Sequence, residues 1–146
     1  MNGFARDEFI SAMLVGEFGN DRLLLHDIFR NLGWRLLEAH KRRDGMRHLG
    51  SSLVEVVVAE RDSSHWNWKK ILNDFRRLVR PPLLIVTSRL ADDALWSEAL
   101  NLGAHDVLAQ PFDRDEVERV IASACRRFRF QPELAARPKV RAANVA

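Results

Sequence analysis

Polar residues with chemically useful side chains come directly after the apolar runs of this sequence. They are Glu17, Glu60, Thr87 and Gln110, which follow or closely follow apolar runs at residues 12–15, 53–59, 83–86 and 107–109. Carboxylate oxygens bind hard divalent cations, and hydroxyl and amide groups hydrogen-bond phosphate oxygens. If the four runs are strands of one parallel sheet, these side chains meet at its carboxyl edge, where such sheets carry their functional crevice.

The apolar pattern predicts the elements that position these residues. Strands are expected at residues 12–15, 34–38, 53–59, 83–86 and 107–109, and helices at 21–32, 43–49, 68–79, 93–102 and 113–128. The branched run at 53–59 is typical of a strand that is buried on both faces. Gly33 and Gly103 are expected to end their helices, since glycine adopts the left-handed conformation at low cost. Strands that alternate with helices predict an α/β fold with a doubly wound parallel sheet.

The stretch from Pro81 to Phe112 resembles the receiver domains of two-component response regulators. The resemblance rests on a strand-end Thr87, the Gly103-Ala104 pair after a helix, Asp106, and Gln110-Pro111-Phe112, where the family usually has Lys-Pro-Phe. It extends more weakly over residues 12–128. It implies a flavodoxin-like (βα)5 sheet of strand order 2-1-3-4-5. We expect an N-terminal extension at residues 1–10, a receiver-like domain at 11–130 and a basic, flexible tail at 131–146.

The resemblance also implies what a phosphorylated receiver needs at the carboxyl edge of the sheet. Such a domain has an aspartate nucleophile, an acidic pair that holds Mg²⁺, and a hydroxyl and a lysine that receive the phosphoryl oxygens. Matched by position, the nucleophile falls on Glu60 and the acidic pair on Gly16 and Glu17. The lysine falls on Gln110, whereas the hydroxyl is kept as Thr87. Three of the required groups are therefore changed.

These changes predict a domain that has lost phosphoryl transfer. The longer side chain of Glu60 misplaces its carboxylate by more than ~1 Å for in-line attack, and Gln110 brings no positive charge. The aromatic switch residue of the family falls on Val107, while Pro111 is kept. Two readings of Glu60 stay open: a permanent imitation of a charged aspartate, or a solvated acid that faces Arg61 or Arg89. A shifted alignment would instead bring Asp62 to the pocket.

Other catalytic or metal chemistry finds little support. The five histidines lack metal-ligand spacing, and the sequence has no glycine-rich phosphate loop and no Gly-x-Ser-x-Gly elbow. Cys125 falls on the apolar face of the last predicted helix, which favours a buried structural thiol. We therefore expect no enzyme and no cofactor, with Mg²⁺ bound only if the pocket still accepts phosphate.

Two tryptophans indicate a protein partner. Trp66 and Trp96 do not fit the buried stripes of their predicted helices, and exposed tryptophans are enriched at interfaces. Trp96 lies on the face formed by the helix at 93–102, the strand at 107–109 and the last helix, which receivers commonly use for contacts. We expect a histidine kinase or other signalling protein as partner, and a homodimer through this face is a subsidiary hypothesis.

Charge and hydropathy place further bounds on function. The 146-residue chain carries a net charge of +3, with much of the excess in its last helix and tail. Nucleic-acid binding is an alternative but is not expected, because no recognition-helix pattern accompanies these charges. No apolar run approaches the ~20 residues of a membrane span. The start, MNGFARDEF, lacks the features of a signal peptide, so a cytoplasmic location is expected.

The sequence thus predicts phosphorylation-independent signalling by a stand-alone divergent receiver, with a working phosphoacceptor as the main alternative.

Overall fold

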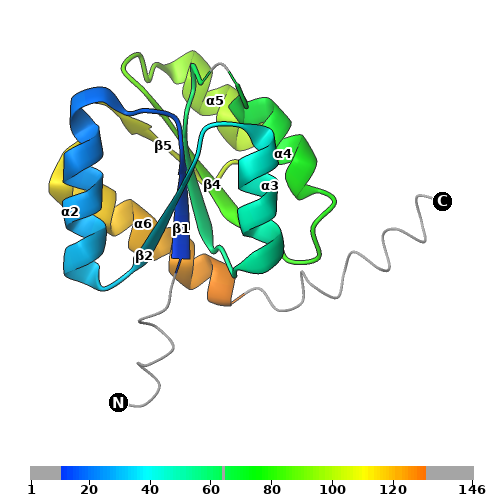
Figure 1. Cartoon of the computed structure of the whole chain (residues 1–146). Helices are drawn as coiled ribbons and strands as arrows, with labels where there is room; N and C mark the ends of the chain where they lie inside the picture. Colours follow the sequence, from blue (N-terminus) through cyan, green and yellow to red (C-terminus); the bar gives the residue numbers. More distant parts are fainter. Residues whose placement is uncertain (1–10, 64, 131–146) are drawn as a thin grey trace.

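Five parallel strands form a single sheet in the computed structural model, which describes residues 11–63 and 65–130 (Figure 1). The strands are β1 (Ser11–Val15), β2 (Arg35–Ala39), β3 (Val56–Glu60), β4 (Leu83–Ser88) and β5 (Asp106–Ala109). The helices are a short 3-10 turn η1 (Gly19–Asp21), then α2 (Arg22–Leu32), α3 (Arg42–Ser51), α4 (Trp68–Phe75), α5 (Asp93–Leu102) and α6 (Arg114–Arg129). The predicted extension at 1–10 and tail at 131–146 lie outside the described residues.

The sheet has the order β2-β1-β3-β4-β5, and each neighbouring pair is parallel. The predicted α/β fold and strand order are therefore confirmed. In the register of the sheet, Glu60 at the end of β3 pairs with Thr87 of β4, and Val15 at the end of β1 pairs with Ala59. The carboxyl ends of the central strands thus stand side by side, as the sequence argument requires.

The strands are apolar on both faces because helices cover both faces. Ala12 and Leu14 of β1 belong to one core cluster, which they share with the apolar stripes of α2 and α6. Met13 and Val15 belong to a second cluster, with side chains from α3, α4 and α5. Side chains of a strand alternate between its two faces, so β1 contributes two residues to each core. Figure 1 shows the sheet between these two helical layers.

The helix ends have clear local causes, and the two ends predicted at glycines are confirmed. Asp92 caps α5 and Asp113 caps α6, each with its carboxylate accepting a backbone N–H, from Leu95 at 2.9 Å and Glu116 at 3.0 Å. Gly33 and Gly103 end α2 and α5 in the left-handed conformation. Asp21 also stands at a cap position, but its side chain makes no capping bond, because it points elsewhere, as described below.

Several predicted boundaries are wrong. The strand expected at 53–59 begins at Val56 and includes Glu60, while Leu53 is 53% exposed. The helix expected at 68–79 ends at Phe75, and tight turns follow it before the proline pair. Val79, the last residue of the predicted helix, is 73% exposed. Proline restricts the residue before it to extended conformations, so a helix cannot reach Pro81. The chain leaves α4 earlier, through i→i−3 bonds from the N–H groups of Arg76, Arg77 and Leu78.

Among the residues that the structure describes, no helix has the length and apolar character needed to cross a membrane.

Candidate functional site

The structure brings the predicted site residues together at the carboxyl edge of the sheet. One hollow of about 230 Å³ is lined by Glu60, Arg61, Asp62, Thr87, Ser88, Arg89, Leu90 and Gln110. A second, of about 240 Å³, is lined by Gly16, Glu17, His40, Glu60, Asp62, Ser63 and His65. Glu60 and Asp62 line both hollows, so the residues that were expected around one pocket are divided between two adjoining hollows.

The carboxylate of Glu60 is hydrogen-bonded to the backbone of the turn that follows β1. Its Oε1 accepts a hydrogen bond from the N–H of Glu17 at 2.9 Å. The same oxygen lies 2.6 Å from the place that a Cβ of residue 16 would take, and Gly16 has φ +133°. Glu60 therefore fills the space that a side chain at position 16 would need. Within the described part of the chain it forms no ion pair with Arg61 or Arg89, although all three residues line the first hollow.

The pocket residues do not fit the magnesium site of a phosphorylated receiver. Gly16 has no side chain to offer, and the carboxylate of Glu60 already accepts a backbone N–H. Within residues 11–63 and 65–130, no group of three or more His, Cys, Asp or Glu side chains could hold a metal ion. Hard divalent cations need several oxygen ligands at once, and these residues do not gather them.

A chain of buried hydrogen bonds links β4, β5 and the start of α2. The hydroxyl of Thr87 donates to Gln110 Oε1 at 3.0 Å, and Gln110 Nε2 donates to Asp21 Oδ2 at 3.3 Å. Asp21 Oδ1 also accepts from the N–H of Phe112 at 3.4 Å. Thr87 is fully buried, and Gln110 and Asp21 are 7% and 8% exposed. These three side chains are fixed by one another.

Asp21 is the site residue that sequence reasoning missed. Asp21 stands at the start of the helix predicted at 21–32, where capping is the usual role of aspartate. The available signal was Gln110 itself, whose buried amide needs an acceptor for its N–H groups. The other switch positions show no polar link of this kind: Val107 is 2% exposed in the apolar core, and Pro111 is exposed.

Trp66 is not a surface residue, and its assignment as an interface candidate is wrong. It is fully buried, and its Nε1 donates to Asp74 Oδ2 at 2.9 Å. Arg42 also binds Asp74, at 2.8 Å, so the loop after Glu60 is fastened to α3 and α4. Trp66 precedes α4, and a helical period therefore said nothing about its burial. Trp96, in contrast, is 36% exposed on α5.

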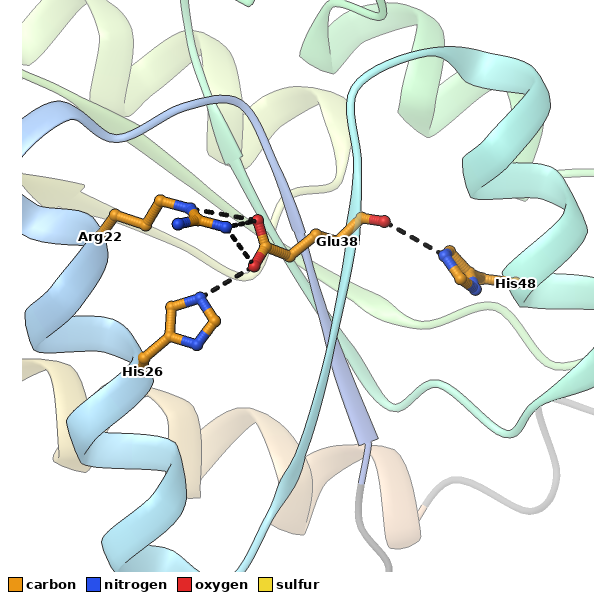
Figure 2. A network of polar contacts seen from close by, with 4 residues as sticks. All are labelled: Arg22, His26, Glu38 and His48. Carbon is orange, nitrogen blue, oxygen red and sulfur yellow. Dashed lines mark hydrogen bonds and ion pairs between the residues drawn. The ribbon is translucent and has the colours of Figure 1, made fainter.

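A second polar network holds the edge strand β2 and plays no part in the pocket (Figure 2). The Glu38 carboxylate accepts from Arg22 Nη2 at 2.7 Å and pairs with His26 Nε2 at 2.8 Å, while its backbone oxygen bonds His48 on α3. Burial raises the pKa of Glu38, but hydrogen bonds and charge from Arg22 and His26 outweigh it, so this pKa lies below its usual value. The network fixes β2 between α2 and α3.

Cys125 has the environment of a structural residue. It is 4% exposed on α6, and burial, aided by the charge of Glu55, raises the pKa of its thiol to about 12. Nucleophilic cysteines need the thiolate, which is absent at neutral pH with such a pKa.

Comparison with known proteins bears on the fold and the family resemblance. No family model matches the chain. Over 97 residues, which make up 63% of this chain, it is 34% identical to the transcriptional regulatory protein CrdR of Helicobacter pylori. The chain covers 44% of that protein, so it spans less than half the length of this curated relative.

Solved structures of the same shape have low sequence identity. The signal receiver domain of an HD domain-containing protein from Pseudomonas fluorescens Pf-5 has a TM-score of 0.71 at 18% identity, over 83% of this chain and 98% of that one. Full-length FixJ from B. japonicum has a TM-score of 0.72 at 20% identity, over 84% of this chain and 61% of that one. A two-component response regulator from Clostridium difficile has a TM-score of 0.69 at 14% identity, over 81% of this chain and 97% of that one. The resemblance in the sequence is thus confirmed in three dimensions, and the chain has the fold of response-regulator receiver domains.

Proposed function

We propose that this chain is a receiver-like signalling domain that acts through protein–protein interaction and without phosphorylation. Its fold and its similarity to a transcriptional regulatory protein support a role in signal transduction. In this proposal the domain is not an enzyme, binds no cofactor and works in the cytoplasm. Its partner is another signalling protein, such as a histidine kinase.

One observation carries the proposal: Glu60 and Gly16 are substituted as a pair. The carboxylate of Glu60 turns onto the N–H of Glu17 and occupies the room of the missing side chain at position 16. A phosphoryl acceptor must instead present its carboxylate oxygen to the incoming group in line. Here that oxygen is engaged by the backbone, and the adjacent metal ligand is absent.

The buried Thr87–Gln110–Asp21 chain supports a fixed conformation. The Thr87 hydroxyl already donates to Gln110, and Gln110 already donates to Asp21. A switch needs two states that a ligand or modification favours differently. With a neutral Gln110 and with Val107 in the apolar core, little at this pocket distinguishes a charged from an uncharged state.

The exposed face around α5 supports a protein partner for this domain. Trp96 and Leu100, one helical turn apart, are 36% and 45% exposed, while Leu95 and Ala99 face the core. Aromatic and aliphatic side chains that are left on one helix face favour an interface. A homodimer through α5, β5 and α6 belongs to the proposal and is taken up in the Discussion.

Tryptophan fluorescence during titration with Mg²⁺, then with Mg²⁺ and beryllofluoride, tests the proposal. Trp66 and Trp68 are buried just beyond the loop that starts at Glu60, so a ligand in the pocket should change their emission. We expect a flat response. The combined variant Gly16→Asp, Glu60→Asp and Gln110→Lys, which restores the family's groups, is the positive control.

A saturable, magnesium-dependent change in the unaltered protein would overturn the proposal and favour a working phosphoacceptor that uses Mg²⁺. Phosphate transfer from a histidine kinase would then be followed with labelled phosphate. Loss of the label with Glu60→Gln or with Asp62→Asn would identify the accepting carboxylate. Asp62 is relevant because it is exposed and lines both hollows.

A further inference from the structure

Five exposed arginines gather at the end of the sheet opposite the pocket. Arg76, Arg77 and Arg80 lie in the connection between α4 and β4, and Arg126 and Arg127 lie in the last turn of α6. The two groups touch, because the Arg80 guanidinium stacks 4.2 Å from the centre of the Phe128 ring and bonds the Phe128 carbonyl oxygen at 3.4 Å. We call these five residues the basic end.

The basic end has no carboxylate that neutralises it among the described residues. The nearby Glu55 is buried and bound by Arg129, and Asp74 is buried and bound by Arg42. The half-buried Asp106 accepts a bond from the N–H of Val107. None of the five arginines forms an ion pair with these acids, and Arg127 meets only a ring nitrogen of His105, at 3.3 Å. Arg77 also acts electrostatically on Asp74, whose charge Arg42 shares, so most of the local positive charge is uncompensated.

Three large apolar side chains are exposed beside these charges. Val79 is 73% exposed and precedes Arg80, and Phe130 is 78% exposed directly after α6. Leu53, 53% exposed, stands two residues before the Glu55 that binds Arg129. Exposed apolar groups among arginines are the composition of a protein-binding surface, since interface centres are rich in arginine and aromatic residues.

We propose that the basic end docks an acidic protein segment that carries apolar side chains. The charge selects an anionic partner, because uncompensated arginines attract carboxylates and form paired hydrogen bonds with them. The apolar groups favour a protein over a nucleic acid, whose interfaces are more polar. This inference rests on the proposed function in that it names the chemistry of the protein partner.

Binding of a labelled acidic peptide tests this surface by fluorescence anisotropy. The probe is a fluorescein-labelled peptide, Glu-Asp-Leu-Glu-Glu-Trp-Glu-Glu-Leu, with one matched peptide that has glutamine for its acids and another that has serine for Leu and Trp. We expect the first peptide to bind and each matched peptide to bind at least about tenfold more weakly, a difference of about 1.4 kcal/mol. Equal binding of all three would overturn the proposal, as would no binding of the first at micromolar concentration.

Two variants locate the binding on the protein. Arg76→Glu with Arg126→Glu should weaken the acidic peptide at least about tenfold, and Val79→Ser with Phe130→Ser should also weaken it. All four side chains are exposed, so circular dichroism should show an unchanged fold. The matched control is Arg43→Glu with Arg119→Glu, the same charge change at exposed sites elsewhere, and it should leave binding unchanged. If this control weakens binding equally, the effect is due to net charge alone, and the proposed location of the binding site is wrong.

Duplex DNA provides the competing outcome. Tighter binding of labelled DNA than of the acidic peptide, with a steep loss in salt that Arg76→Glu and Arg126→Glu abolish, would make this a nucleic-acid surface and overturn the proposal. Failure here is distinguishable from failure of the proposed function, because the beryllofluoride titration reports on the opposite end of the sheet.

Discussion

Glycine at position 16 is tied to the extra methylene of Glu60. With φ +133°, residue 16 is in a conformation that L side chains rarely adopt, and a Cβ there would lie 2.6 Å from Glu60 Oε1 and 3.0 Å from its Cγ. Two of the three changes that distinguish this pocket from the family's pattern, at positions 16 and 60, are thus one structural arrangement. A side chain at position 16 is not expected to be accommodated while Glu60 keeps its place.

Gly16→Ala tests this dependence through a double-mutant cycle with Glu60→Ala. The single change should lower the free energy of unfolding by roughly 1–3 kcal/mol from backbone strain alone, with the contact to Glu60 adding to it. Glu60→Ala should remove the part of the destabilisation that comes from the contact with Glu60. The coupling energy between the two changes should therefore be about 0.5–3 kcal/mol. Urea unfolding monitored by circular dichroism measures all four proteins.

Gly103→Ala is the matched control for this cycle. Gly103 also has a positive φ, +111°, but nothing lies within 4 Å of its would-be Cβ. Its cycle with Glu60→Ala should be additive within about 0.5 kcal/mol. An additive result for Gly16 as well would show that Glu60 does not occupy that space in solution.

Asp74 should make stability depend on pH. Burial raises its pKa, but hydrogen bonds from Arg42 and Trp66 outweigh burial and hold the pKa below the usual 3.8. The charged carboxylate therefore stabilises the fold at pH above 3.8, and this contribution is lost as pH falls through the lowered pKa. Asp74→Asn should cost roughly 1–3 kcal/mol at neutral pH, and the difference from the unaltered protein should shrink in acid.

Urea unfolding at a series of pH values measures this effect. Asp44→Asn is the control, since Asp44 pairs with Arg47 at 3.3 Å with its side chain 46% exposed. Exposed pairs contribute little, so its stability should stay within about 0.5 kcal/mol of the unaltered protein. A pH profile of Asp74→Asn that runs parallel to that of the unaltered protein would contradict the assignment.

The sequence could predict which residues reach the pocket but not how they meet. Glu60, Thr87 and Gln110 end apolar runs, and the carboxyl edge of a parallel sheet collects such residues. The contact of Glu60 with the N–H of Glu17 depends on a side-chain rotamer and on the conformation of a turn. No periodic pattern in the sequence indicates either of them. Asp21 was missed for a similar reason, because its local capping pattern concealed a contact with Gln110, a residue far along the chain.

At the scale of elements, regular patterns were the reliable guide and loops were not. The apolar stripes of α2 and α6 and the branched run of β3 predicted elements that the structure contains. Trp66 lies in a loop, and its burial follows from tertiary contacts with α3 and α4. The strand order came from the family resemblance, since the apolar pattern alone leaves more than one order open.

Helix α3 contains two glycines that should respond oppositely to alanine. A Cβ on Gly45 would lie 2.2 Å from Trp66 Cζ3, whereas Gly50 has open space around it. Gly45→Ala should lower stability by roughly 1–3 kcal/mol through overpacking. Gly50→Ala should raise it by roughly 0.5–1 kcal/mol, because alanine favours the helix.

Thermal unfolding compares the two variants, and tryptophan emission gives a second readout. Gly45→Ala should also shift the emission of Trp66 to longer wavelength as its packing loosens, which Gly50→Ala should not do. If both variants gain stability, Trp66 does not pack on α3 as described, and the loop after Glu60 is less firmly held than the proposed function requires.

At the scale of the whole molecule, the two ends of the sheet differ in kind. The carboxyl edge holds polar side chains that satisfy one another, from Glu60 on the Glu17 N–H to the buried Thr87–Gln110–Asp21 chain. The opposite end exposes five arginines, whose charge is only partly compensated, and apolar groups. The receiver fold normally places its chemistry at the first of these ends. We infer that this chain keeps the fold as a support for surfaces elsewhere.

Self-association through α5, β5 and α6 should therefore be independent of the pocket. We expect a dimer in sedimentation velocity at high protein concentration, with the same proportion in the presence of Mg²⁺ and beryllofluoride. Trp96→Glu with Leu100→Glu should shift the protein to monomer, because charges then stand at the centre of the apolar contact. Leu23→Glu, on α2 at a side chain 77% exposed, is the control and should leave the dimer intact. A monomer at every concentration would remove this interface from the proposal, and a dimer that forms only with beryllofluoride would show that the pocket still controls the surface.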